Sequence, residues 1–394
     1  MISVYDKKDD CCGCTACEHI CPTNAIKMVP DEEGFLYPET DQELCIDCGK
    51  CIESCAFQKG YDVSDNYKNP NVYALKHKLD DVRKKSSSGG AFTAISDYIL
   101  SEGGVIYGAA FDETMAVLHK RAETASERNK FRGSKYVQSN LNDVYSQVKK
   151  DLKDDRIVLF TGTGCQAAGL KRYLMKSNVN VEKLLLVDFI CHGTPSPLVF
   201  KDFITYLEKN NKTKVVQYKF RSKIMGWGHT EEAIFLDGRN DYKSTRSQLY
   251  KQLFYANLCI RPSCHACRYA NMVRPSDITI ADFWGIDNYF PEFKDSLGVS
   301  AVIINTSKGA KVYSKIVDNI ESISSTIEDC SSGQRNLREP TPVNPRREAF
   351  WSDYHRNGFE YIAKKYAGYN LKSIIKKNLK AILSRSGLLK AMKK

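Results

Sequence analysis

Two identical cysteine patterns near the start of the chain constrain its fold more than any other feature. Cys11, Cys14, Cys17 and Cys21 have the spacing Cys-x2-Cys-x2-Cys-x3-Cys, and Cys45, Cys48, Cys51 and Cys55 repeat it. This is the ligand spacing of ferredoxins that hold two [4Fe–4S] clusters. Residues 1–60 are therefore predicted to form a dicluster ferredoxin-like domain of the α+β class. A zinc knuckle fits less well, because zinc sites rarely repeat three evenly spaced cysteines plus a fourth.

The spacing also predicts which cysteines share a cluster. Three cysteines two residues apart bind one cluster, and the fourth, after a longer gap, binds the other. The predicted ligand sets are Cys11, Cys14, Cys17 and Cys55 for one cluster, and Cys45, Cys48, Cys51 and Cys21 for the other. Cys12 lies off this spacing and is expected to be a packed thiol.

Composition and charge limit the kind of protein. The chain begins without an apolar signal segment and contains no run of 18 apolar residues, so we expect a cytoplasmic protein with reduced thiols and no membrane-spanning helix. The net charge is +11, but residues 371–394 carry eight cations and no acidic residue. The rest of the chain is nearly neutral, which argues against nucleic-acid binding. The tail is predicted to be a basic amphipathic helix in peripheral contact with the inner membrane face, with a solubilising tail as the alternative.

Predicted strands and helices alternate after residue 70. Strands are expected at Val72–Lys76, Val105–Phe111, Ile157–Phe160, Leu184–Ile190, Val215–Phe220, Ala233–Leu236, Ile278–Ile280 and Ala301–Ile304. Helices are expected at Ala91–Leu100, Leu141–Leu152, Gln166–Met175, Pro197–Lys209, Gln248–Leu258 and Gly309–Asn319. This alternation is typical of the α/β class. We predict a mixed α/β domain over residues 70–345 and a helical region over residues 346–394.

Four further cysteines occupy positions where a sheet could bring them together. Cys165 and Cys191 each follow a predicted strand, and Cys264 and Cys267 form a Cys-x2-Cys pair. Neighbouring parallel strands present their following loops at the same edge of a sheet. The four cysteines could hold a third [4Fe–4S] cluster. Buried structural thiols, or half of a zinc site, are open alternatives.

Three segments have the composition of anion or nucleotide contacts. Ser86–Gly90 precedes a predicted helix, whose N-terminus favours a phosphate, although a plain serine cap is the alternative. Arg132–Tyr136 places two cations around a glycine and is interpreted as a phosphate or flavin contact, or as a solvated charge run. Gly162–Ala167 fits the fingerprint Gly-x-Gly-x-x-Ala, and Asp188 ends the next strand, so a nicotinamide site is an alternative.

Several short motifs occur in the order found in a known family. They are Ser87–Gly90, Phe131–Ser139, Gly162–Gln166, Cys191–Gly193, Phe220–Lys223, Gly226–Trp227, Arg261–Cys264, Arg274–Thr279 and Asp282–Gly285. Over about residues 8 to 310 the chain resembles the family of coenzyme F(420) hydrogenase/dehydrogenase beta subunits. Gly164 replaces the proline that is usual in its turn, and Ser222 stands where aspartate is common.

The resemblance implies a flavin-binding domain with an iron–sulfur cluster near FAD. It favours the third cluster on Cys165, Cys191, Cys264 and Cys267. The implied FAD contacts are Ser87, Ser88, Gly89, Gly90, Arg132, Ser134, Lys135, Thr161, Gly162 and Thr163. Lys135 is expected to stabilise the reduced flavin, and His192 to donate a proton, with a packed histidine as the alternative.

These expectations define a predicted function. An external ferredoxin, or another electron donor, would reduce the clusters, and FAD would pass electron pairs to a small organic acceptor. The acceptor would be a deazaflavin coenzyme or a biosynthetic intermediate, for instance in surface polysaccharide synthesis. A flavin reductase that uses NAD(P)H and a non-catalytic electron-transfer subunit of a larger complex are the alternatives.

Overall fold

The computed structural model describes residues 3–368, which form two compact units. Unit 1 contains the residues up to Leu198, together with Lys219–Thr230 and Ile260–Pro342; unit 2 contains Val199–Tyr218, Glu231–Cys259 and the residues from Val343 onward. All of the predicted site residues belong to unit 1. The boundaries predicted at residues 1–60, 70–345 and 346–394 stay predictions.

An eight-stranded mixed sheet organises unit 1, in the order β13-β3-β12-β11-β7-β6-β4-β5. The strands are β3 (Asn66–His77), β4 (Val105–Phe111), β5 (Val117–Ala122), β6 (Val158–Thr163), β7 (Leu184–Phe189), β11 (Ile278–Asp282), β12 (Ser300–Thr306) and β13 (Ile320–Ser325). Neighbours among β4, β6, β7 and β11 pair in parallel, and the remaining pairs are antiparallel. The predicted mixed α/β class is confirmed.

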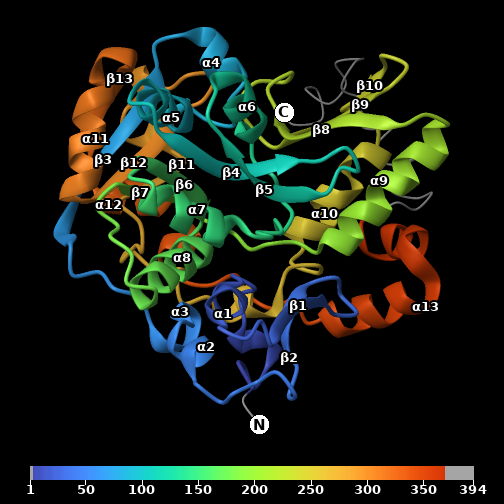
Figure 1. Ribbon diagram of the computed structural model, residues 1–394. Helices are drawn as coiled ribbons and strands as arrows, with labels where there is room; N and C mark the ends of the chain where they lie inside the picture. The colour runs from blue at the N-terminus through green and yellow to red at the C-terminus, as the bar shows by residue number, and fades with distance from the viewer. Residues whose placement is uncertain (1–2, 369–394) are drawn as a thin grey trace. The chain divides into compact units, whose positions relative to one another are not determined.

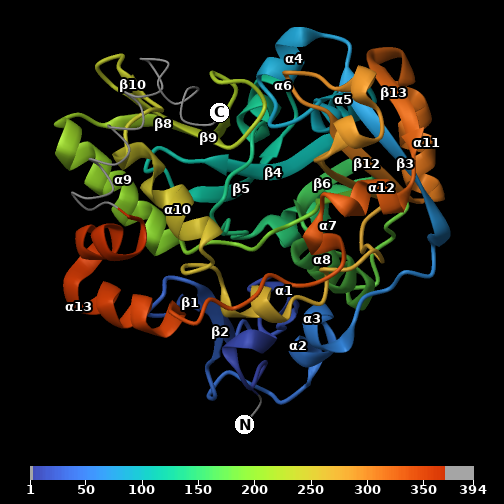
Figure 2. The ribbon, with the colours of Figure 1, turned by 180° about the vertical axis from the view of Figure 1, so that it is seen from behind.

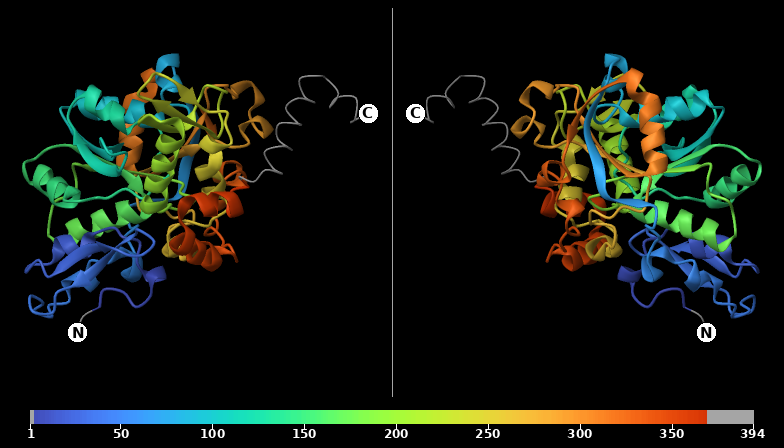
Figure 3. Two further views of the ribbon diagram at one scale, coloured as in Figure 1. Left: turned by 90° about the vertical axis from the view of Figure 1, so that its right-hand side faces the viewer. Right: turned by 90° about the vertical axis from the view of Figure 1, so that its left-hand side faces the viewer.

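Helices cover both faces of this sheet (Figure 1). Val105 and Tyr107 of β4 pack with α7 (Val144–Lys153) and α8 (Gly164–Lys176), whereas Ile106 packs with α5 (Ala91–Ser101) and α11 (Ser307–Ile316). This alternation follows from the two-residue period of a strand. The short helix α12 (Ile327–Ser332) packs on β3 (Figure 2). Helix α11 lies beside β3 in the right panel of Figure 3, where Tyr313 stacks on Tyr73 with ring centroids 4.3 Å apart.

The cysteine-rich N-terminal segment forms a small α+β layer within unit 1. Its elements are α1 (Ala16–Ile20), β1 (Ile26–Pro30), β2 (Leu36–Thr40), α2 (Lys50–Glu53) and α3 (Ala56–Lys59). Strands β1 and β2 form an antiparallel hairpin, whose turn is closed by Asp31 accepting the N–H groups of Glu33 and Phe35. Helices α1 and α3 pack on α8, so the cysteine-bearing segment lies directly on the sheet-covering layer.

Unit 2 is built around aromatic side chains. Its elements are α9 (Pro197–Asn211), β8 (Val215–Ser222), β9 (Thr230–Phe235), β10 (Asn240–Asp241), α10 (Leu249–Tyr255) and α13 (Arg347–Tyr366). Phe203 contacts Tyr250 and Phe359, and the Tyr354 hydroxyl donates to Asp202 at 2.6 Å. Two short helices in unit 1, α4 (Asp80–Lys84) and α6 (Ala125–Arg128), complete the regular elements.

The sequence prediction differs from the structure in identifiable places. It missed β5 and β13, and it started the first strand at Val72, whereas β3 begins at Asn66. The tail at 371–394, for which membrane contact was predicted, lies outside the described residues. Within residues 3–368, no helix has the length and apolar character needed to cross a membrane.

A buried ion pair joins the carboxyl end of β7 to the segment before β11. Asp188 is fully buried and accepts bonds from Arg274 at 2.6 Å, Ser276 at 2.8 Å and Thr279 at 2.6 Å. Because its carboxylate is fully engaged, it is not available to bind a ribose, as the nicotinamide alternative requires. Its structural role is to fix the strand ends from which Cys191 extends.

Replacing Arg274 should therefore be strongly destabilising. Arg274→Leu leaves the buried carboxylate of Asp188 without a counter-charge, which costs about 3–5 kcal/mol. Arg335→Leu is the matched control, because the ion pair of Arg335 with Glu339 is exposed and contributes about 0.3–0.5 kcal/mol. Urea unfolding followed by circular dichroism measures both variants. Equal urea midpoints for the two would contradict the structural role of the pair.

Candidate functional site

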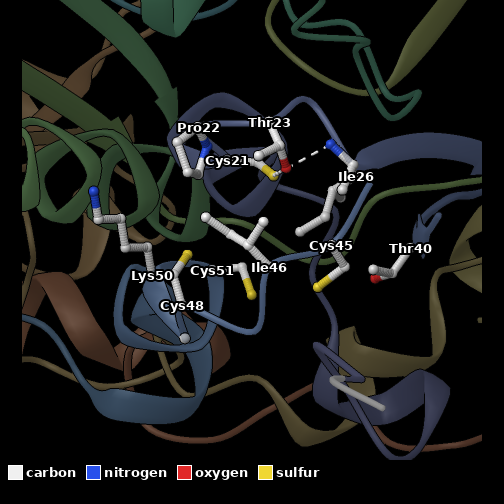
Figure 4. A pocket seen from close by; sticks show the side chains of 12 residues that line it. Cys21, Pro22, Thr23, Ile26, Thr40, Cys45, Ile46, Cys48, Lys50 and Cys51 are labelled. Atoms are coloured by element: carbon white, nitrogen blue, oxygen red, sulfur yellow. Dashed lines mark hydrogen bonds between the residues drawn. The ribbon is translucent and has the colours of Figure 1, made fainter. Parts of the chain in front are cut away.

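One predicted set of cysteines surrounds a cavity in the N-terminal segment and is called the outer set here. Cys21, Cys45, Cys48 and Cys51 line this cavity, and Figure 4 shows their sulfur atoms facing a common space. Gly49 has a φ of +70°, which lets the chain turn into α2 between Cys48 and Cys51. Cys48 is exposed, whereas the other fourteen cysteines are buried or half-buried.

The other predicted set, called the inner set, lines a second cavity. Its cysteines are Cys11, Cys14, Cys17 and Cys55. Burial raises the pKa of Cys55 to about 12, so this thiol is protonated unless a metal centre replaces the proton. Gly169 lets helix α8 lie close to the inner set, because a Cβ at this position would be 2.7 Å from the Cys14 sulfur.

The third set comes together at the edge of the large sheet. Cys165 lies in the first turn of α8, Cys191 follows β7, and the pair Cys264 and Cys267 lies at a 3-10 helix, η4 (Pro262–Ala266). Burial raises the pKa of the Cys191 thiol, and the thiols of Cys264, Cys165 and Cys267 raise it further. The four thiols are therefore close enough to influence one another, and each is half-buried.

Nothing in residues 3–368 supports a single metal ion at these cysteine sets. Within residues 3–368, no three Cys, His, Asp or Glu side chains converge as the ligands of one metal ion do. A cubane of four irons and four sulfides is larger than an ion and needs its thiolates further apart. All fifteen cysteines are free of disulfide bonds. The half zinc site considered from the sequence therefore has no support among the described residues.

Cys12 connects the inner set to the third set. It is buried, and the neighbouring thiols of Cys14 in the inner set and Cys165 in the third set raise its pKa. Tyr269 lies close to the same cysteines, and within the described residues its buried hydroxyl has no hydrogen-bond partner. An unpartnered buried donor is costly, and a bound cluster would supply sulfur acceptors there. Cys12 itself packs in the core cluster that contains Cys14 and contacts Cys165.

The predicted FAD contacts at Ser87–Gly90 and at Ser134 lie together. The Ser87 hydroxyl accepts the Ser134 N–H at 2.7 Å, and Gly90 caps α5 with a φ of +100°. Gly89 must be glycine, because a Cβ there would lie 2.2 Å from the carbonyl oxygen of Leu75. The two loops thus form one backbone cradle at the N-terminus of α5.

Two cations adjoin this cradle. The Lys135 ammonium donates only to carbonyl oxygens, those of Lys130 and Arg132, each at 2.9 Å. Its side chain is half-buried by surface, but dense packing around the ammonium lowers the pKa of Lys135 to about 7. Within the described residues the buried Nε of Arg132 has no partner. Two incompletely satisfied cations fit an anionic ligand such as the pyrophosphate of FAD.

The remaining predicted site residues serve the local fold. The Thr161 hydroxyl donates to the carbonyl of Tyr107 at 2.9 Å, and Thr163 caps α8 in a capping box with Gln166. Gly162 packs against that glutamine. His192 is half-buried beside Cys191, and its carbonyl accepts the Thr341 hydroxyl.

Sequence reasoning missed His119 on β5. Its Nε2 bonds to the carbonyl of Thr161 at 3.0 Å, and its buried Nδ1 has no partner within the described residues. Burial lowers the pKa of His119 to about 4, and Lys135 contributes to this shift, so the imidazole is neutral near pH 7. The signal was absent because β5 itself was not predicted.

A polar and aromatic network that sequence reasoning also missed fixes the Ser87–Gly90 loop from the opposite side. Arg221 forms a paired contact with Asp282 at 2.8 Å to each oxygen. Lys223 donates to the carbonyl of Ser88 at 2.8 Å. Trp227 stacks on Trp284 with centroids 4.8 Å apart. These residues lie in the motifs that carry the family resemblance, which was the available signal.

Comparison with known proteins gives two matches to described families. Residues 10–59 match the 4Fe-4S dicluster domain, and residues 155–329 match the C terminus of the beta subunit of coenzyme F420 hydrogenase/dehydrogenase. Residues 155–329 thus belong to the family of these beta subunits. The chain carries an N-terminal dicluster domain with two [4Fe–4S] clusters, as predicted.

A relative and a solved structure are also similar. One of the subunits of the F(420)H(2) dehydrogenase of Methanosarcina mazei is 22% identical over 323 residues, which cover 79% of this chain and 84% of that protein. A chain of the F420-reducing [NiFe] hydrogenase complex from Methanosarcina barkeri is 18% identical, with a TM-score of 0.48, over 79% of this chain and 94% of that one. With its family and its dicluster domain, this chain is an iron–sulfur electron-transfer protein.

The close approach of α8 to the inner set generates a prediction. In Gly169→Ala the new methyl group would displace the Cys14 sulfur, so one cluster should be lost and iron content should fall by about four per chain. Gly228→Ala is the control, because nothing lies within 4 Å of a Cβ at that position. Iron analysis of anaerobically purified protein measures both. Unchanged iron in Gly169→Ala would refute this role of the contact.

Proposed function

We propose that this chain is an oxidoreductase that connects an external one-electron donor to a small organic acceptor through three [4Fe–4S] clusters and FAD. The outer, inner and third cysteine sets would hold the clusters. The Ser87–Gly90 loop, with Arg132, Ser134 and Lys135, would hold FAD. Clusters supply one-electron transfer, and FAD exchanges electrons singly or in pairs.

The observation that carries this proposal is the position of Cys12. Cys12 and Cys14 lie in one core cluster of unit 1, and Cys165 of the third set packs against that cluster, so the two sets are neighbours. The inner and outer sets exchange their fourth cysteines. Cys21 of the first pattern lines the outer cavity, and Cys55 of the second pattern lines the inner cavity. The three sets therefore follow one another in a row.

The outer set offers the point of contact for a protein donor. Besides exposed Cys48, the same loop exposes the apolar side chains of Leu44 and Ile46, at 49% and 64% of their surface. Exposed apolar patches with charged neighbours mark protein interaction sites. The Methanosarcina mazei relative is by name one component of a dehydrogenase complex, which supports work with protein partners.

The contacts of the Ser87–Gly90 loop support the proposed FAD site. The carbonyl side of the Ser87–Gly90 loop is held by Lys223 and by the N–H of His77, which bonds to Gly89 at 2.8 Å. The amide groups at the start of α5 are thereby left for an anion. The acceptor itself stays a proposal, with a deazaflavin coenzyme favoured by the family and by the relative's name.

Cofactor content tests this proposal directly. Anaerobically purified protein should contain about twelve irons and one FAD per chain. Cys191→Ser should lower iron to about eight and retain FAD. Cys259→Ser is the matched control, because that buried cysteine belongs to none of the three sets. Eight irons in the wild type would remove the third cluster, and protein without flavin would remove the acceptor half of the proposal.

The lowered pKa of Lys135 predicts a pH dependence of FAD binding. Below pH 7 the ammonium is charged in the free protein and ready to pair with an anion. Above that pH, binding must first take up a proton, so affinity should fall about tenfold or more between pH 6 and 9. Titration of the flavin-free protein with FAD, followed by fluorescence, measures the dissociation constant.

Two variants identify the titrating group. Lys135→Met should bind FAD weakly and with no pH dependence in this range. Lys130→Gln should behave as the wild type, since Lys130 is an exposed residue of the same loop. A pH dependence that persists in Lys135→Met would assign the effect to another residue.

A further inference from the structure

A buried arginine lies beside the inner cysteine set. Arg261 is fully buried and donates to the carbonyl oxygens of Cys11 at 2.8 Å and Leu36 at 2.9 Å. It also donates to the sulfur of Cys11 at 3.6 Å. Its guanidinium lies 4.1 Å from the centre of the Tyr37 ring. The Arg261 side chain therefore binds both the backbone carbonyl and the sulfur of Cys11, the first cysteine of the inner set.

Arg261 lacks the carboxylate partner that other buried arginines of the described residues have. Three other buried arginines, Arg128, Arg221 and Arg274, each pair with an aspartate. Within residues 3–368, no carboxylate lies within ion-pair distance of Arg261; its remaining bond, at 3.0 Å, goes to the amide oxygen of Gln138. Burying a cation without a counter-charge is strongly unfavourable. The protein therefore needs an anion at this place.

A thiolate-bound cluster is that anion. It is negatively charged, and reduction by one electron adds a further negative charge without any bond being made or broken. A neighbouring cation and hydrogen bonds to the sulfur atoms stabilise the reduced form and raise the reduction potential. We propose that Arg261 is the positioning residue that supplies the counter-charge of the inner cluster and raises its reduction potential through Cys11. This inference rests on the proposed ligand set Cys11, Cys14, Cys17 and Cys55.

Arg261 also links two sites along the chain. Its carbonyl accepts the N–H of Cys264 in the third set at 3.0 Å. Gly13 makes room for it, because a Cβ there would lie 2.9 Å from Nη1 of Arg261. Burial alone would lower the reduction potential of the inner cluster. The charge of Arg261 raises this potential, so the inner cluster can accept electrons from the outer set.

Redox titration followed by EPR tests the role. Iron content and the number of cluster signals in the wild type come first, since fewer than two clusters would refute the ligand sets rather than this inference. Cys48→Ser then identifies the outer-cluster signal, Cys191→Ser identifies the signal of the third set, and the remaining signal belongs to the inner set. The reductant is dithionite, which supplies one electron per cluster.

Arg261→Gln removes the charge and should lower the equilibrium constant for reduction of the inner cluster at least tenfold, which is about 59 mV for one electron. The outer signal should stay unchanged. Arg172→Gln is the matched control: its guanidinium donates to the carbonyls of Glu53 and Gly60 in the same layer but bonds to no cysteine. An inner potential equal to that of the control would overturn the proposal.

Arg261→Lys keeps the charge and covers the case in which Arg261→Gln fails to load iron. Loading and a near wild-type inner potential in the lysine variant would support the counter-charge. A folded lysine variant, by circular dichroism, that also fails to load iron would overturn it, because the guanidinium would then be needed for its bonds and not for its charge.

Discussion

The packing of the cysteine-rich layer on helix α8 is the constraint on which the rest of unit 1 depends. At Gly169 no side chain separates the helix from Cys14, so the inner set lies against the layer that covers the sheet. The same helix carries Cys165 in its first turn. One helix thus fixes the separation of two cysteine sets, and the thiol of Cys12 fills the space between them.

The buried and half-buried sites differ in how their charges are balanced. The cysteines of the third and inner sets are half-buried or buried, so charges placed there are screened less than at the surface. Asp188 and Arg274 neutralise each other inside the sheet edge, whereas Arg261 bonds to Cys11, Leu36 and Gln138 and has no carboxylate partner within residues 3–368. The cradle differs again, since Lys135 and Arg132 are held without carboxylates next to the start of α5.

Much of this arrangement could be predicted from the sequence because it depends on local spacing. The two cysteine patterns indicate the dicluster domain, which the family match confirms, and the strands before Cys165 and Cys191 place both at one sheet edge. Contacts between distant segments could not be predicted. Arg261 and Cys11 are 250 residues apart, and nothing in the segment around Arg261 specifies that its side chain is buried there. His119 was missed because β5 is an edge strand with weak alternation.

The exposure of Cys48 has a consequence for the lifetime of the protein. Dioxygen attacks iron–sulfur centres that it can reach, and in this molecule it meets the outer cluster before the shielded ones. In the proposed electron path, air would therefore act first at the end that faces the external donor. Inactivation of this kind is open to repair by reinserting iron and sulfide at the surface, without unfolding the chain.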